Sequence, residues 1–175
     1  MVTLGPAASK LVVMKLDWEN PAWKNLPTRV DAKDDSDIRT CYIHFLLSFL
    51  VEPTQAVLKE YFEKKTRLAT IFPGLVNDKP ELVLLVLETL RTKVVETVLV
   101  AKTYKMKLFG SFSLKNLLEL YNWKGPKQGA DIEDREEEKE EIVGALNEFY
   151  KLLLTSTQYG VVFQVSIFLR IEAFQ

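Results

Sequence analysis

Cys41 and His44 are the side chains best suited to nucleophilic, acid–base or metal chemistry, and the chain holds one residue of each type. They lie three positions apart in an apolar run, so a helix would place them on one face. A catalytic pair needs a third group that orients the base, and a structural zinc site needs four ligands. The neighbouring sequence supplies neither, so we interpret His44 as a structural histidine and Cys41 as a small buried residue.

Carboxylates are concentrated in one run, where eight of the eleven residues 131–141 are acidic. The run lacks the ligand spacing of a calcium loop. The sequence also lacks a glycine-rich phosphate loop and the Gly-x-Ser-x-Gly motif of a nucleophilic serine. We interpret the run as the solvated start of a helix, with an acidic docking surface as the alternative. We therefore expect a protein that is not an enzyme and that needs neither metal nor cofactor.

Basic residues supply the best candidate for a binding surface. The net charge of the chain is −1, so any contact with RNA must come from a local patch or through a partner. Six basic residues crowd one region of the sequence: Arg91, Lys93, Lys102, Lys105, Lys107 and Lys115. With Tyr104 nearby, we expect this region to contact RNA or an acidic partner, the alternative being a solvated edge of the fold.

The elements that must position these residues are predicted to be helices. Apolar residues recur at three- and four-residue spacing over 37–51, 53–64, 66–72, 79–96, 101–109, 114–121 and 135–158. We expect Asp35 or Ser36 to cap the first of these helices, Ser113 to cap the sixth, and residues 122–134 to form a loop. The buried stripe of the first helix is predicted to hold Ile38, Cys41, Tyr42, Phe45, Leu46, Phe49 and Leu50, and that of the last helix Ile142, Leu146, Phe149 and Leu153.

The helix over residues 79–96 is apolar on more than one side. Val83, Leu87, Leu90, Val94 and Val98 form one stripe, and the run from Leu82 to Leu87 adds apolar residues that fall off it. A helix of this kind is buried between neighbours on two sides. Together with the recurring helix pairs, this predicts an all-α fold of the armadillo or HEAT type, an α-solenoid, with a closed bundle as the alternative.

We expect three parts along the chain: an irregular segment over 1–36 that contains Trp18 and Trp23, a helical-repeat domain over 37–160, and a divergent tail over 161–175. Apolar and other residues alternate in the tail, which is the period of a strand, although the sequence offers this strand no clear partner. We find no secretory signal and no apolar stretch of membrane-spanning length, so we expect a soluble intracellular protein.

Three long stretches show a recognisable order of features: TCYIHFLLSFL from Thr40, IFPGLVNDKPELVLLVLETLRTKVV from Ile71, and AKTYKMKLFGSFSLKNLLELYNW from Ala101. An aromatic helix precedes a Gly-Leu turn, a Val-Leu-Glu-Thr-Leu helix, and a basic Lys-Thr helix that leads to Leu-Tyr. Taken in this order, the stretches resemble the N-terminal domain of the nucleolar pre-ribosomal-associated protein one family. The likeness covers about residues 31–164.

The resemblance implies a segment of a very large α-helical scaffold of the nucleolus, within the nucleus, that acts in early assembly of the 60S subunit. It implies support of precursor rRNA processing, including maturation of 5.8S and large-subunit rRNA. The implied partners are proteins of the pre-ribosomal particle, including a DEAD-box helicase, and precursor rRNA contacted directly or indirectly, with no membrane. The resemblance transfers no catalytic residue.

The chain departs from the family pattern in two respects. It is far shorter than the family members, and after Gln164 the sequence VSIFLRIEAFQ no longer resembles them. We therefore expect a fragment or an altered end. The alternative function is an armadillo-type protein-interaction module without a ribosomal role.

Overall fold

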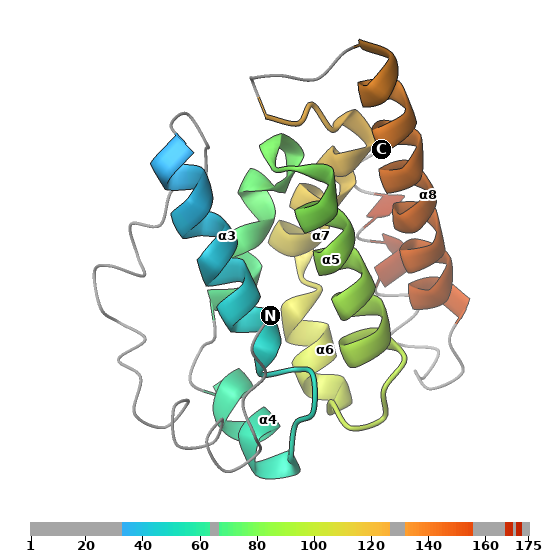
Figure 1. Ribbon diagram of the computed structural model, residues 1–175. Helices are drawn as coiled ribbons and strands as arrows, with labels where there is room; N and C mark the ends of the chain where they lie inside the picture. The colour runs from blue at the N-terminus through green and yellow to red at the C-terminus, as the bar shows by residue number, and fades with distance from the viewer. Residues whose placement is uncertain (1–32, 64–66, 127–131, 156–166, 170, 173–175) are drawn as a thin grey trace. The chain divides into compact units, whose positions relative to one another are not determined.

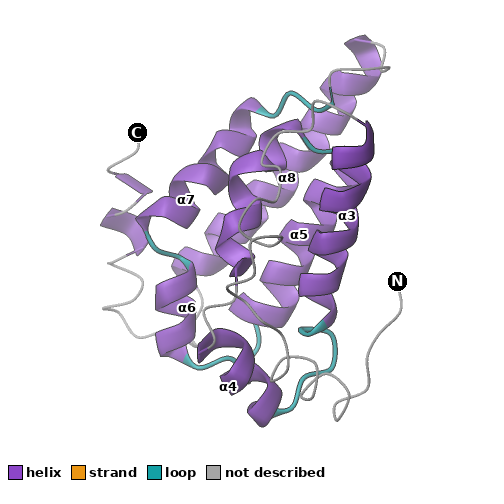
Figure 2. Cartoon of the chain, turned by 90° about the vertical axis from the view of Figure 1, so that its left-hand side faces the viewer, coloured by secondary structure: helices purple, strands orange, loops and turns teal. Residues whose placement is uncertain are grey.

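The structure is a computed structural model that describes residues 33–63, 67–126, 132–155, 167–169 and 171–172 (Figure 1). These residues form helices joined by turns and loops, and no strand occurs among them (Figure 2). The prediction of an all-α fold is thus confirmed. Spatial proximity of the Cα atoms divides the chain into two compact units, Met1–Ile71 and Phe72–Gln175.

The first unit contains α3 (Lys33–Ser48), α4 (Gln55–Glu63) and the start of the 3-10 segment η1 (Arg67–Asn77). Its core holds buried aromatic and aliphatic side chains. The ring of Phe49 packs against the ring of Phe45 at 5.0 Å and against that of Tyr61 at 5.7 Å between centroids. The buried Tyr61 hydroxyl donates to the Leu46 carbonyl oxygen at 3.0 Å, which ties α4 to α3. Burial of these side chains is the main stabilising term of the unit.

The register of α3 differs from the predicted one. Ile38 is 57% exposed and Cys41 is exposed, whereas Ile43 and Leu47 are buried, so the prediction that Ile38 and Cys41 face the core is wrong. The physical reason is the buried Arg39, which donates from Nη2 to the Ile71 carbonyl oxygen and thereby brings its own side of the helix inward.

The ends of the first two helices also differ from the expected ones. Helix α3 begins at Lys33, so Asp35 and Ser36 lie inside it and do not precede it. At the start of α4, the Thr54 Oγ1 accepts a hydrogen bond from the Val57 backbone N–H at 3.2 Å, so a threonine caps this helix. The segment η1 continues through Pro73, where the sequence predicted a stop.

The second unit contains α5 (Pro80–Leu90), the π-helical segment η2 (Arg91–Val95), α6 (Lys102–Leu108), α7 (Ser111–Leu118), the 3-10 segment η3 (Glu119–Asn122) and α8 (Ile132–Thr155). Helix α8 lies alongside α5 and also packs against η2 and η3 (Figure 1). All four residues of its predicted stripe, from Ile142 to Leu153, are fully buried, which confirms that stripe. Phe149 from this stripe meets Phe109 edge to face at 5.6 Å.

Helix α5 is buried on more than one stripe, as predicted. Leu82, Val83, Val86 and Leu87 are buried, and Leu84 and Leu85 are half-buried. The helix is extended by the π turn, in which the Glu96 backbone N–H donates to the Arg91 carbonyl oxygen at 2.9 Å.

The helix ends at Val95, directly after the π turn, so the predicted stripe holds at the buried Val94 and does not continue beyond it. Val98 is 79% exposed, in a loop beyond the end of the helix at Val95, and its predicted place in the core is wrong.

A corner within the second unit joins the start of α5 to the end of η3. The Trp123 indole N–H donates to the Asp78 carbonyl oxygen at 2.9 Å, and the backbone N–H groups of Lys124 and Gly125 donate to Val76 at 2.9 and 3.2 Å. Gly125 has φ of 71°, and a Cβ at this position would lie 2.8 Å from the Trp123 ring. The turn therefore requires glycine.

Three further predictions for this unit are wrong. Helix α7 starts at Ser111 after Gly110, so Ser113 is a buried helical residue and not its cap. Helix α8 starts at Ile132, inside the predicted loop. Residues 167–169 and 171–172 of the tail are helical, because a lone strand would leave its backbone groups without partners, whereas a helix satisfies its own.

Other predictions are not decided by the structure. The irregular segment predicted over 1–36 falls almost entirely outside the described residues. The boundaries of the helical-repeat domain and the stacking of its helices remain predictions. Within the described parts of the chain, no helix combines the length and the hydrophobicity needed to cross a bilayer.

Candidate nucleic-acid interface

The six predicted contact residues lie on one continuous part of the second unit, from the start of η2 to α7. They divide into two groups. Arg91 and Lys105 are engaged within the fold. Lys93, Lys102, Lys107 and Lys115 are exposed, and none of these four forms an ion pair with another described residue.

The Arg91 guanidinium is held between two carboxylates. Its Nη2 donates to both carboxylate oxygens of Glu88 at 2.9 and 2.8 Å, and its Nη1 donates to Glu96 at 2.9 Å. The π turn explains the second bond, because i to i+5 hydrogen bonding brings Glu96 above Arg91. The pKa of Arg91 is raised above its ordinary value, mainly by the hydrogen bond to Glu88, and burial opposes this effect. The charge of Arg91 is thus largely balanced inside the protein.

Lys105 is buried in the interior of α6, with 3% of its surface exposed. Its Nζ donates to the Thr97 carbonyl oxygen at 2.6 Å and to the Val95 carbonyl oxygen at 3.3 Å. Val95 is the last residue of η2, so the ammonium group satisfies a carbonyl at the negative end of the helix. Burial lowers the pKa of Lys105 to about 8. Lys105 therefore fastens the loop that precedes its own helix.

The structure also reveals an exposed aromatic residue that the sequence analysis missed. Phe112, in the first turn of α7, is 59% exposed. It lies three residues before Lys115, so the two side chains are neighbours on the helix surface, and it follows Lys107 by five residues. The sequence did hold a sign of this exposure, because Phe112 does not share the helical spacing of Leu114 and Leu117, which are the buried positions of the same helix.

We define the α6–α7 basic segment as Lys102, Lys107, Phe112 and Lys115. Its exposed ammonium groups suit the phosphate oxygens of a nucleic-acid backbone. An exposed aromatic ring suits the face of an unpaired base. The segment thus combines the two kinds of contact that single-stranded RNA requires.

His44 and Cys41, the two residues for which we expected no catalytic role, lie on α3. His44 is half-buried and Cys41 is exposed. Among the described residues, no three side chains of the metal-binding types gather closely enough to hold an ion.

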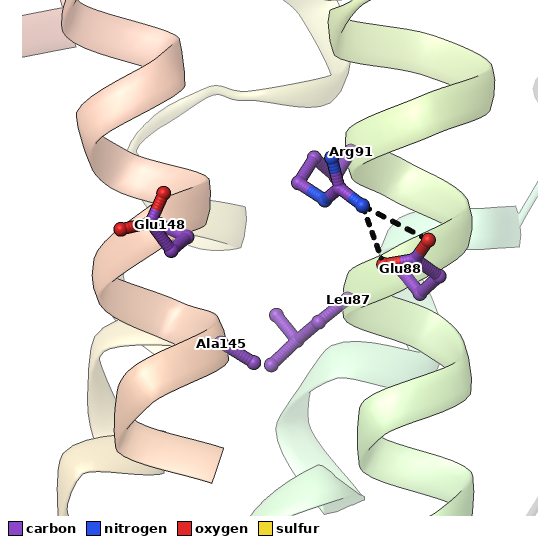
Figure 3. A pocket seen from close by; sticks show the side chains of 5 residues that line it. All are labelled: Leu87, Glu88, Arg91, Ala145 and Glu148. Atoms are coloured by element: carbon purple, nitrogen blue, oxygen red, sulfur yellow. Dashed lines mark hydrogen bonds and ion pairs between the residues drawn. The ribbon is translucent and has the colours of Figure 1, made fainter. Parts of the chain in front are cut away.

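A small pocket lies between α5 and α8 (Figure 3). Its volume is about 260 Å³, and it is lined by Leu87, Glu88, Arg91, Ala145 and Glu148. Leu87 and Ala145 point toward each other from the two helices, and the paired Glu88 and Arg91 side chains lie across from Glu148 (Figure 3). We name this site the α5–α8 pocket.

Two kinds of comparison with known proteins, one with family models and one with single proteins, give consistent results. Residues 1–173 match the family model Npa1, described as "Ribosome 60S biogenesis N-terminal". Two proteins named "Nucleolar pre-ribosomal-associated protein 1" are similar over 168 residues: that of Mus musculus is 32% identical and that of Homo sapiens 30% identical. Each alignment covers 93% of this chain and 7% of the relative, so the chain spans about 7% of the length of these relatives.

The family match is longer than the resemblance expected from the sequence. It begins at residue 1 and continues to residue 173, so the expectation that the likeness ends at Gln164 is wrong. No solved structure matches the chain.

Proposed function

The chain belongs to the Npa1 family, whose matching region is the N-terminal part of a 60S ribosome biogenesis protein, and on this premise we propose that it is a non-enzymatic scaffold in large-subunit assembly. The observation that carries the proposal is the family match over nearly the whole chain, together with identity to two relatives named as nucleolar and pre-ribosomal-associated. We place the protein in the nucleolus on the same grounds.

We further propose that the helices stack in the manner of an armadillo or HEAT repeat. The support is α5, whose buried residues extend beyond one stripe and which has α8 packed along it. A helix in the interior of a stack must bury surface toward both neighbouring layers. A relative more than ten times longer than this region would allow such a stack to continue, since each relative is covered over 7% of its length.

The proposed ligand of the α6–α7 basic segment is precursor rRNA. The support is physical: the segment has exposed ammonium groups that form no ion pair with described residues, and an exposed phenyl ring one helical turn from Lys115. Lys93 is a further exposed cation on η2. Lys105 and Arg91 hold this part of the fold together. In this scheme the protein supports processing of precursor rRNA, including 5.8S and large-subunit rRNA, in a particle that contains other assembly proteins such as a DEAD-box helicase.

The test is charge reversal at the exposed lysines alone. Lys102→Glu combined with Lys107→Glu is expected to reduce ultraviolet crosslinking of the protein to precursor rRNA and to lessen the salt dependence of binding, since each removes a phosphate contact. The matched control is Lys59→Glu combined with Lys151→Glu, which reverses two exposed lysines on α4 and α8. Lys105 is left out, because reversal of a buried lysine would unfold the segment.

The outcomes separate this proposal from the protein-interaction module. Loss of RNA crosslinking in the α6–α7 variant, with the control unchanged, supports RNA contact. Loss of a protein partner with RNA crosslinking unchanged favours an armadillo-type interaction module instead. Unchanged crosslinking and unchanged partners would remove the basic segment from the proposal.

A further inference from the structure

We propose that the α5–α8 pocket binds an arginine side chain presented by another protein. This site is separate from the proposed RNA contact, because it is lined from α5, η2 and α8 and carries the opposite charge. Its recognition would therefore persist if the basic segment proved not to bind RNA.

The pocket carries a net negative charge. Two carboxylates and one guanidinium line it, and the Arg91 guanidinium is already bonded to Glu88 and to Glu96 outside the lining. Glu148 is exposed and has no ion-pair partner among the described residues. The unbalanced charge is negative, so the pocket attracts a cation and repels the phosphate groups of RNA.

The size and the apolar lining of the pocket suit one long side chain. Its volume of about 260 Å³ lies below the range of roughly 300–1,000 Å³ that holds drug-sized ligands, which suits a single side chain. Leu87 and Ala145 form an apolar surface below the charged rim (Figure 3). A long side chain that packs its methylene stem on an apolar surface and holds a charged head at the rim is arginine or lysine.

The lining of the pocket and the open surface of α8 beside it favour an arginine carried by a protein. Glu88 and Glu148 line the pocket from two different helices. The planar guanidinium of arginine presents five donors in a fixed fork, so it can bond one carboxylate while it remains close to the other. Gly144, next to Ala145 on α8, is exposed, and a Cβ built there meets no atom within 4 Å. A partner backbone can therefore approach α8 closely beside the pocket.

The test uses nuclear magnetic resonance of the 175-residue chain titrated with a defined probe. The probe is a helical Ala-rich peptide of about 15 residues with one central arginine, and its matched form carries the neutral isostere citrulline in place of arginine. The expected result is movement of the Gly144, Ala145 and Glu148 amide signals by the arginine peptide, with a several-fold smaller movement by the citrulline peptide.

Two variants and one control assign the binding to the pocket. Glu148→Gln removes the exposed carboxylate and is expected to weaken binding by about two- to fivefold, the range of an exposed ion pair. Ala145→Leu fills the pocket with a side chain of the protein itself and is expected to abolish the signal movement without loss of helicity. Glu136→Gln makes the same charge change at an exposed position about a third of a turn around α8 and is expected to leave binding unchanged.

Several outcomes would overturn the proposal. Equal movement of the amide signals with the citrulline peptide would show that the pocket does not recognise the positive charge of arginine. An unchanged affinity in Ala145→Leu would place the peptide elsewhere. Movement of the same three signals by a poly-uridine RNA, or on self-association at rising protein concentration without peptide, would assign the pocket to RNA or to a second copy of the chain.

Discussion

Replacement of Lys105 by methionine removes a buried ammonium group and keeps an apolar stem of similar length. Two effects of the change oppose each other at neutral pH. The carbonyl oxygens of Thr97 and Val95 lose a charged donor, and a hydrogen bond to a charged group contributes about 1.5–3 kcal/mol. The variant also avoids the free-energy cost of burying the ammonium charge, and this gain is comparable in size to the loss of the hydrogen bonds. We therefore expect only a small net change in the free energy of unfolding near neutral pH.

The informative quantity is the pH dependence of the difference between wild type and Lys105→Met. Burial lowers the pKa of Lys105 to about 8 in the folded protein, from 10.5 for a free lysine side chain. Between these values the unfolded chain binds more protons than the folded one, so stability of the wild type rises with pH. At about 1.4 kcal/mol per pKa unit, the wild type gains about 2 kcal/mol relative to the variant by about pH 9.5.

The assay is urea unfolding at about pH 7 and about pH 9.5, with Lys107→Met as the control on the same helix. Burial raises the pKa of both Tyr121 and Tyr150, so their effect on stability is a loss above pH 10, in the opposite direction. That effect cancels in the comparison, because both proteins contain the two tyrosines. If the difference in the free energy of unfolding between wild type and Lys105→Met does not change with pH, the assignment of Lys105 as a buried cation is refuted. The same holds if the difference between wild type and Lys107→Met changes with pH by an equal amount.

Three further substitutions test the local structure by chemical denaturation. Gly144→Ala places a methyl group in open space in the interior of α8 and is expected to stabilise by about 0.5–1 kcal/mol; a loss of stability would contradict the helical exposure of this residue. Gly125→Ala forces a Cβ toward the Trp123 ring at positive φ and is expected to destabilise by about 1–2 kcal/mol, so an unchanged midpoint would count against the turn. Thr54→Ala removes the acceptor for the Val57 N–H and is expected to cost about 1 kcal/mol, with Thr54→Ser as the variant that should retain the cap.

The long regular helices were predictable because hydrophobic spacing alone decides them. In α8 the four stripe residues from Ile142 to Leu153 keep a strict helical period, and each is fully buried. In α3 apolar residues occur at too many positions for one face to be preferred by spacing. There the choice depends on Arg39, whose bond to the Ile71 carbonyl oxygen joins residues 32 positions apart and leaves no local signal.

The features that refine the candidate interface depend on tertiary structure. Apolar periodicity does not reveal the π turn after α5, which brings Glu96 to Arg91, or the end of the helix at Val95, which leaves Val98 exposed. Lys105 has the same residue type as its exposed neighbours on α6, and only its two carbonyl partners distinguish it. Composition and spacing predicted the basic region as a candidate contact surface, but they could not separate the lysines that hold the fold from those that face solvent.

The most direct test of the proposed RNA contact is mass spectrometry of peptide–RNA adducts after ultraviolet crosslinking of the nucleolar protein in its native particle. We expect adducts within residues 102–115, with Phe112 or an adjacent lysine as the linked residue. Adducts confined to other parts of the chain, or their absence from a protein that still sediments with large-subunit precursors, would contradict it.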